Sequence, residues 1–255
     1  MKLLVSLSSY GDKNLQYLNH VIDVYKSYKK YDVTIDVHCT VKLNRNDINQ
    51  IVHDDPETTC LFHRQDFIRE QNNYDLFLFA EYDMLIQESC IDTYLKHDKL
   101  LPIDYCLGFI RYENTPEQIQ YLIDLWKNID GYDYIKNYNI SLNNNEYFSL
   151  TNVHQAAYLL TKDKLKYVIG NTNFNITTLD GNGPELASSG IFKDWLIGPR
   201  GIINKVLPLN RNDLEHCFIH HMADCHCNAP GVNADPITFR NNTITKDLLF
   251  ENLNL

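Results

Sequence analysis

This 255-residue chain has few long apolar runs and few basic residues. No window matches the roughly 20 apolar residues that cross a bilayer, so we expect no membrane span. The opening residues MKLLVSLSSYGD contain one Lys and too short an apolar stretch for a secretory signal. Basic residues number 23 against 33 acidic ones, and the net charge of -10 disfavours a nucleic-acid partner. An acidic chain that holds a phosphorylated ligand needs a cation to screen it, which mildly favours a metal-dependent site.

The cysteines do not form a disulfide pattern. There are seven, an odd number, and four stand singly in apolar segments: Cys39, Cys60, Cys90 and Cys106. We therefore expect reduced thiols and a cytoplasmic protein.

The N-terminal pattern predicts an α/β fold. Residues 2–8 form a short apolar run that ends in small polar residues, as a buried parallel strand does before its loop. Residues 14–31 carry apolar side chains at helical spacing, and residues 33–41 alternate like a strand. This β-α-β order predicts a right-handed crossover and a parallel sheet.

Later segments are predicted from the same periodicities. In chain order we expect a strand or loop near 59–64 with a polar helix after it, a strand at 74–86, a helix at 90–101, a strand at 104–113, a helix at 115–129 that Thr115 caps, a loop or ragged hairpin at 130–147, and a helix at 154–169. The remainder is loop-rich, with its strongest turn cluster at 180–190.

Two carboxylates end the most apolar strand. In YDLFLFAEYDMLIQ, Glu81 and Asp83 flank Tyr82 and interrupt a run that is hydrophobic on both faces. Residues i and i+2 of an extended chain point the same way, and two anions so close repel unless a cation or proton lies between them. Mg²⁺ or Mn²⁺ with oxygen ligands is the natural occupant. The alternative is a strand that ends at the surface in two solvated acids.

The segment YDLFLFAEYDM resembles the strand and D-x-D motif of GT-A glycosyltransferases, and is similar to a group of these enzymes from fungi and large DNA viruses. Agreeing segments follow in order: LVSLSSY, GFIRYE, NVHQAAYLLTKDKL, ASSGIF and LEHCFIHHMAD. The resemblance implies a GT-A (Rossmann-like) fold with a mixed, mainly parallel central sheet in one domain over 1–255. Residues 1–110 would bind nucleotide sugar and metal, 111–227 would face the acceptor, and 228–255 would form a tail.

The resemblance also implies ligands and their residues. A nucleotide-diphosphate sugar would donate a hexose-type sugar to a carbohydrate or related acceptor, with Mn²⁺ or Mg²⁺ bridging the diphosphate to the acid pair; a viral chain would act in the host cytoplasm. The implied donor-binding residues are Ser6, Ser8, Ser9 and Tyr10 after the first strand, Arg64, and Tyr82 between the acids. An ordinary strand-to-helix turn is the alternative for the serines, and a surface salt bridge is the alternative for Arg64.

The segment EHCFIHHMADCHC gathers seven His and Cys residues, ligand types that suit zinc. Its spacing argues against a standard structural site, because it has no C-x₂-C pair and adjacent His220 and His221 cannot both point inward from one strand. The resemblance implies instead that one histidine of this region completes the metal shell, with His221 favoured over His220. A core histidine is the alternative.

An inverting transferase needs a carboxylate base, and Glu185 is preferred over Asp180 because Pro184 and nearby glycines constrain its loop. A purely local role at a helix start remains open for Glu185. Asp194 and Trp195 are acceptor candidates, and an intrastrand ion pair is the simplest role for Arg111 and Glu113.

Two rival functions remain open. One is a non-catalytic nucleotide-sugar or carbohydrate-binding protein on the same fold. The other is a metal-dependent nucleotidyltransferase, although SLSSYGDKN has only one Gly and one Lys where such an enzyme has a Gly-rich basic loop.

Overall fold

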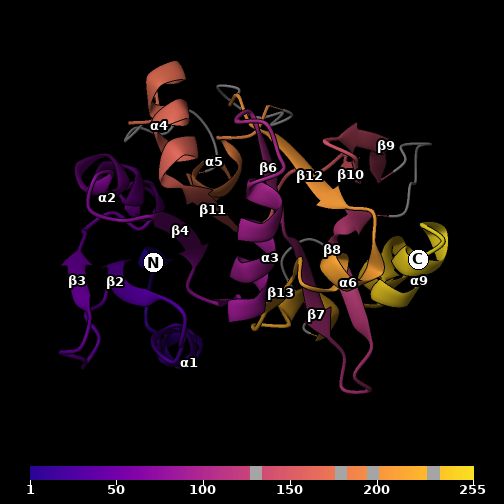
Figure 1. The fold of residues 1–255 in the computed structure, drawn as a ribbon. Helices are drawn as coiled ribbons and strands as arrows, with labels where there is room; N and C mark the ends of the chain where they lie inside the picture. Colours follow the sequence, from indigo (N-terminus) through magenta and orange to yellow (C-terminus); the bar gives the residue numbers. More distant parts are fainter. Residues whose placement is uncertain (127–133, 176–182, 194–200, 229–235) are drawn as a thin grey trace.

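The computed structural model describes residues 1–126, 134–175, 183–193, 201–228 and 236–255. These residues form a mixed α/β fold with three sheets (Figure 1). The predicted fold class is confirmed.

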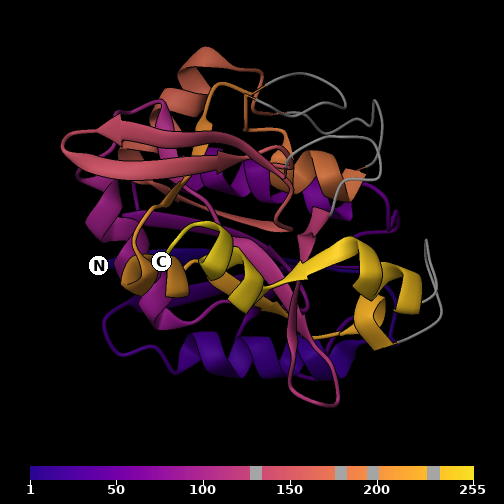
Figure 2. The ribbon, with the colours of Figure 1, turned by 90° about the vertical axis from the view of Figure 1, so that its right-hand side faces the viewer.

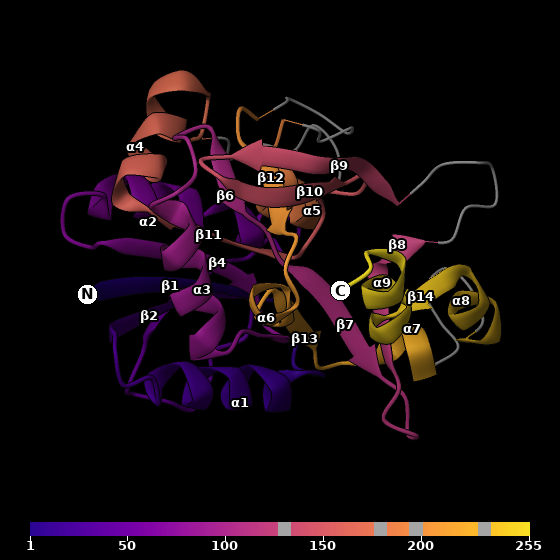
Figure 3. The same cartoon turned by 45° about the vertical axis from the view of Figure 1, so that its right-hand side comes forward.

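A five-stranded sheet in the order β11-β4-β1-β2-β3 forms the N-terminal half. Its strands are β1 (Lys2–Ser9), β2 (Asp32–Cys39), β3 (Asn49–Val52), β4 (Leu76–Glu81) and β11 (Ala157–Thr161). β11 is antiparallel to β4, and the other neighbouring strands are parallel. Helix α1 (Leu15–Lys26) lies on one face, and α2 (His63–Glu70) and α4 (Lys162–Asn171) lie on the other (Figures 1 and 3). Strand β4 is buried from Leu76 to Ala80 because helices cover both faces of the sheet.

The rest of the chain adds two sheets. One has the order β6-β12-β10-β9 and contains β6 (Tyr105–Leu107), β9 (Ile135–Leu142), β10 (Asn145–Leu150) and β12 (Asn204–Pro208). The other has the order β14-β8-β7-β13-β5 and contains β5 (Met84–Leu85), β7 (Ile110–Asn114), β8 (Gln120–Trp126), β13 (Phe218–His221) and β14 (Thr243–Thr245). Strand β5 follows β4 directly, so the chain passes from the first sheet to this one at Tyr82 and Asp83.

Shorter helices complete the described chain. They are the 3₁₀ turn Thr59–Leu61, α3 (Glu88–Asp98), α5 (Gly183–Ser189), α6 (Arg211–Glu215), α7 (Cys225–Asn228), α8 (Pro236–Asn242) and α9 (Lys246–Asn252). The C-terminal helices α7 to α9 gather beside β8 and β14, as the turned ribbons show (Figures 2 and 3).

The helix predicted at 115–129 is wrong. Residues 120–126 form β8, which pairs with β7 in a hairpin. Thr115 and Pro116 begin a β-turn and do not start a helix. The Gln118 amide donates to the Thr115 carbonyl at 2.9 Å, and Gln118 has a φ of 64°. Pro fits the second position of a β-turn as well as it fits the first turn of a helix, so this signal was ambiguous.

Other predictions were partly right. The helix predicted at 154–169 begins only at Lys162, because residues 157–161 form β11. The strand at 104–113 divides into β6 and β7 around Gly108, and β3 was missed. The segment predicted as a loop or ragged hairpin contains the β9–β10 hairpin. The turn cluster at 180–190 contains α5.

The main cluster of buried hydrophobic residues runs from Leu3 to Leu253 and draws on all three sheets, and a smaller cluster contains Ile123, Cys227 and Phe239. All seven cysteines are free, and Cys225 alone among them is not fully buried. Among the described residues, no helix is long and apolar enough to cross a membrane.

Candidate functional site

The acid pair lies at the carboxyl end of the central strand. Glu81 is the last residue of β4 and stands opposite Ser8 of β1, while Asp83 occupies the short connection to β5. The backbone is held on both sides: the Tyr82 amide donates to the Ser8 carbonyl at 3.1 Å, and the Glu81 amide donates to the Ala156 carbonyl at 3.0 Å. Ligands of open α/β sheets bind at this edge.

The charge of Asp83 disfavours ionisation of Glu81. Burial, followed by the charge of Asp83, raises the pKa of Glu81 to about 7. Asp83 is 3% exposed, and its Oδ1 atom is buried with no hydrogen-bond partner among the described residues. A buried carboxylate oxygen without a partner is costly, and it is the kind of atom that a cation would satisfy.

His221 joins this pair from the other end of the chain. It ends β13, which runs antiparallel to β5 with His221 opposite Met84. Its Nε2 lies 3.1 Å from Asp83 Oδ2, and its Nδ1 lies 2.5 Å from Glu113 Oε1. Burial opposes a charged ring, but hydrogen bonds to Asp83 and Glu113 raise the pKa of His221 to about 9. The structure therefore brings Glu81, Asp83 and His221 together.

Glu113 has a role that sequence reasoning missed. It is fully buried in β7, and its Oε2 accepts a hydrogen bond from the Cys227 amide at 2.7 Å. Burial would raise the pKa of Glu113, but the hydrogen bond and charge of His221, together with the Cys227 amide, outweigh burial and lower it. The intrastrand ion pair considered for Arg111 and Glu113 is not formed, since each bonds to another strand. The strand pattern of GFIRYE identified both residues, but the partner of Glu113 lies 108 residues further along the chain, and the partner of Arg111 lies in the adjacent strand β8.

His220 points away from the acids. Its ring stacks on Tyr112 with centroids 4.9 Å apart, and its Nε2 lies 3.1 Å from Asp224 Oδ1 and 3.1 Å from Asn114 Nδ2. Neighbouring residues of a strand face opposite sides, so only one of the two histidines reaches the acid pair. The expectation that they cannot both point inward is met, and His221 is the one that faces Asp83.

A buried ion pair stands behind the acids. Arg111 Nη2 lies 2.5 Å from Asp124 Oδ1, and Arg111 Nε donates to Asp124 Oδ2 at 3.0 Å. Burial disfavours the charged form of both groups, but each charge stabilises the other. The net effect lowers the pKa of Asp124 and raises the pKa of Arg111. The positive charge of Arg111 partly offsets the rise in the pKa of Glu81 that burial and Asp83 cause. Asp124 was missed because its segment was predicted to be helical.

The buried Lys205 and the half-buried His154 adjoin this ion pair. Burial lowers the pKa of Lys205 to about 8, and Asp124 opposes the shift. Burial and the charge of Arg111 lower the pKa of His154 to about 3. His154 Nδ1 lies 3.0 Å from Ser189 Oγ, which connects the end of α5 to the region of the acids. No motif in the sequence marked Lys205, and the segment NVHQAAYLLTKDKL contained His154 without assigning it a role.

The predicted donor-binding serines are not in a loop. Ser6, Ser8 and Ser9 belong to β1 itself and are buried, and Ser6 Oγ has no partner among the described residues. Tyr10 follows the strand and is 54% exposed. Burial and the charges of Glu81 and Asp83 raise the pKa of Tyr10.

Tyr82 lies beneath Tyr10. The two rings meet edge to face with centroids 5.8 Å apart, and the Tyr82 hydroxyl accepts a hydrogen bond from Asn14 Nδ2 at 2.7 Å. Tyr82 is 8% exposed and is therefore a fixed support for Tyr10.

Arg64 is buried and hydrogen-bonded to the backbone of α5. It is 2% exposed in α2 and donates through Nη2 to the Leu186 carbonyl of α5 at 2.6 Å. The Phe174 ring lies 5.2 Å from its guanidinium carbon. The prediction of a surface salt bridge at Arg64 is therefore wrong, and the guanidinium links α2 to α5 through its hydrogen bond.

The base candidates are only partly described. Glu185 is half-buried in the first turn of α5, one turn before Ser189, and its side chain has no hydrogen-bond partner among the described residues. Asp180, Asp194 and Trp195 lie outside the described residues.

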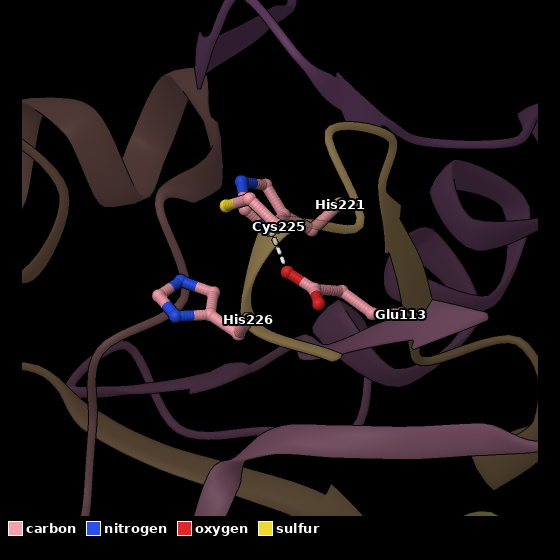
Figure 4. A group of neighbouring side chains, drawn as sticks. All are labelled: Glu113, His221, Cys225 and His226. Atoms are coloured by element: carbon pink, nitrogen blue, oxygen red, sulfur yellow. Dashed lines mark hydrogen bonds and ion pairs between the residues drawn. The ribbon is translucent and has the colours of Figure 1, made fainter. Parts of the chain in front are cut away.

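Four possible metal ligands cluster beside the acids. Glu113, His221, Cys225 and His226 each offer one ligand atom, and these atoms all lie within 4.8 Å of one another (Figure 4). Burial, followed by the charges of Glu113 and Asp83, raises the pKa of the Cys225 thiol to about 11. Burial lowers the pKa of His226, and its ring stacks on Phe239.

A hard divalent cation fits the residues at the carboxyl end of β4. Asp83 has a buried oxygen without a partner, Glu81 supplies a second carboxylate, and His221 turns a ring nitrogen toward Asp83. Two carboxylates and one imidazole are donors that Mn²⁺ accepts. Mg²⁺ suits the carboxylates better than the imidazole.

Comparisons with known proteins add little. No protein-family model matches this chain. No curated protein matches it. The chain is similar to a solved structure described as "crystal structure of a glycosyltransferase involved in the glycosylation of the major capsid of PBCV-1". The identity is 10%, the TM-score is 0.37, and the match covers 86% of this chain and 93% of that chain. Because this likeness is so distant, the fold and the site rest on the chain's own residues.

Proposed function

We propose that this chain is a metal-dependent glycosyltransferase that moves a hexose-type sugar from a nucleotide-diphosphate sugar to a carbohydrate or related acceptor. The observation that carries the proposal is the environment of Asp83. This carboxylate is buried at the carboxyl end of a central parallel strand, one of its oxygens lacks a partner, and Glu81 and His221 lie beside it. Such a group is stable when a cation completes it.

The chain's own residues would hold that cation in a defined way. Glu81 and Asp83 supply oxygen ligands, and His221 supplies Nε2, the nitrogen that faces Asp83. Glu113 orients the ring by accepting the Nδ1–H bond, as outer-shell carboxylates do for metal-bound histidines. A divalent cation at this place neutralises the charge that develops on a diphosphate leaving group.

The donor would enter beside Tyr10, whose exposed ring stands at the rim of the site over the fixed ring of Tyr82. The backbone of β1 at Ser8 and Ser9 would lie along the nucleotide, since these residues end the strand next to Glu81. An acceptor hydroxyl would need a base in the inverting case, and Glu185 remains our candidate because α5 reaches this region through Ser189 and His154.

A thermal-shift panel of nucleotide sugars tests the proposal. With Mn²⁺ present, the correct donor at 100 times its dissociation constant would stabilise the protein by about 2.7 kcal/mol. At about 2–4 °C per kcal/mol for a chain of this size, the melting temperature would rise by about 5–10 °C. A chelator should abolish the rise.

Asp83→Asn is the informative variant and Asp32→Asn is its control. Asp32 is exposed at the first residue of β2, the opposite edge of the same sheet, so its substitution makes the same charge change away from the site. We expect Asp83→Asn to remove the Mn²⁺-dependent shift and turnover, and Asp32→Asn to keep both. Full donor affinity in Asp83→Asn would favour the non-catalytic binding protein, and no shift with any donor would contradict the proposal.

A further inference from the structure

A second group of ligands adjoins the acid pair and differs from it in chemistry. Glu113 comes from β7, His221 from β13, and Cys225 and His226 from α7, so three elements bring the four side chains to one place (Figure 4). Three of the ligands lie within residues 221–226, and strand pairing adds Glu113 from a distant segment, so the group has no C-x₂-C spacing. Its donors are one thiol, two imidazoles and one carboxylate.

The distances are close to those of a tetrahedral site. Zinc bonds to sulfur, nitrogen and oxygen are about 2.0–2.3 Å long, which places tetrahedral ligand atoms about 3.3–3.7 Å apart. The four ligand atoms lie within 4.8 Å of one another, so the widest pair must approach by only about 1 Å. His221 Nδ1 and Glu113 Oε1, which lie 2.5 Å apart, must separate by about 1 Å.

Two of the four donors are free to bind. Neither Cys225 Sγ nor a ring nitrogen of His226 makes a hydrogen bond to another described residue, and both side chains are only half-buried, so an ion can reach them. Glu113, in contrast, is fixed: the Cys227 amide holds its Oε2, and Oε1 is left facing His221. The group therefore combines a rigid buried carboxylate with one accessible thiol and one accessible imidazole.

We propose that Glu113, His221, Cys225 and His226 bind a zinc ion at a site separate from the Glu81–Asp83 pair. Thiolate and imidazole donors in a four-ligand set select zinc over Mn²⁺ and Mg²⁺, which prefer oxygen. Binding replaces the Cys225 S–H bond and the His221 Nδ1–H bond with bonds to the metal, and both protons leave to solvent.

Zinc binding would compete with the proposed catalytic cation, a consequence that rests on the proposed function. A neutral imidazole keeps one N–H and offers one lone pair. With zinc on Nδ1, the Nε2–H donates to Asp83 Oδ2, a contact present at 3.1 Å. With a cation on Nε2, the Nδ1–H donates to Glu113 Oε1, a contact present at 2.5 Å. The structure accommodates either tautomer, and His221 serves one metal at a time.

Cobalt(II) is the probe that tests the zinc site. The full chain, stripped with a chelator under reducing conditions, is titrated with Co²⁺ and the ion is then displaced with Zn²⁺. We expect one ion per chain, the intense visible bands of tetrahedral cobalt, and a sulfur-to-cobalt charge-transfer band. Cys225→Ser should lose the charge-transfer band and bind zinc at least about tenfold more weakly, since even outer-shell losses cost that much.

Three more variants make the test specific. His226→Gln should also weaken zinc binding by at least about tenfold, and its control, His216→Gln, should not, because His216 is exposed outside the group. Asp83→Asn should keep the cobalt spectrum, which places the ion away from the acid pair. A wild-type spectrum without the charge-transfer band, or a band that survives Cys225→Ser, would overturn the proposal.

Failure of the zinc site and failure of the transferase are separable. In the wild type, rising zinc should reduce the Mn²⁺-dependent donor shift, while Cys225→Ser should keep that shift at all but high zinc concentrations. A donor shift without a cobalt–thiolate spectrum refutes the zinc site alone. The spectrum without any donor shift leaves the zinc site and refutes the transferase.

Discussion

Breaking the ion pair between Arg111 and Asp124 should cost far more stability than breaking an exposed pair. The two side chains are 12% and 2% exposed and share two close N–H···O bonds. Arg111→Met leaves the Asp124 carboxylate buried without its main counter-charge, and such a loss costs about 3–5 kcal/mol. For a chain of this size the melting temperature should fall by about 6–20 °C. Arg111→Met/Asp124→Leu should recover most of that loss, because removing both charges removes the uncompensated one.

Urea unfolding of the wild type, both single variants and the double variant measures the coupling energy. We expect about 3 kcal/mol of coupling, since the losses do not add. Lys26 and Asp47 provide the control: their side chains are 36% and 37% exposed, and their coupling should be about 0–1 kcal/mol. Additive losses at Arg111 and Asp124, or a loss below about 1 kcal/mol in Arg111→Met, would refute the reasoning.

Two more predictions concern single sites. Burial opposes ionisation of Asp213, but the hydrogen bonds from Lys96, Asn210 and His97 together outweigh burial, and the pKa of Asp213 is lowered. The contribution of Asp213 to stability is therefore full above the unfolded pKa and is lost as pH falls through the folded one. Asp213→Asn should therefore destabilise the protein at neutral pH, and urea unfolding at falling pH should show the difference from wild type vanish in acid. Gly108→Ala should lose about 1–3 kcal/mol of unfolding free energy, because its new Cβ would stand 2.3 Å from Lys205 Cε. Its control, Gly170→Ala, meets no atom within 4 Å in helix α4 and should be neutral or stabilised by up to about 1 kcal/mol; equal effects at the two glycines would contradict the packing argument.

Much of the N-terminal half was predictable because its signals are local. Strand β1, helix α1 and strand β2 appear in the sequence as an apolar run, a helical stripe and an alternating segment. The errors fall where one local pattern supports two structures. Thr115 and Pro116 suit a helix start and a β-turn equally, and pairing with β7 decided for the hairpin. Residues 157–161 became a strand because the edge of β4 was available to pair with them.

Some features of the candidate site were likewise predictable from the sequence, and others were not. The sequence by itself determined that two carboxylates end a buried strand, since the apolar run before Glu81 and the break at Asp83 are properties of consecutive residues. It also determined that His220 and His221 face opposite sides, because a strand alternates.

Only the tertiary structure decided what these residues meet. His221 reaches Asp83 because β13 pairs with β5, and it reaches Glu113 because β13 pairs with β7 on its other side. The same pairing gives the Cys225 and His226 group its buried carboxylate. Sequence periodicity reports which face of an element is apolar, but the partners of His221 are set by strand pairing between segments that lie more than a hundred residues apart.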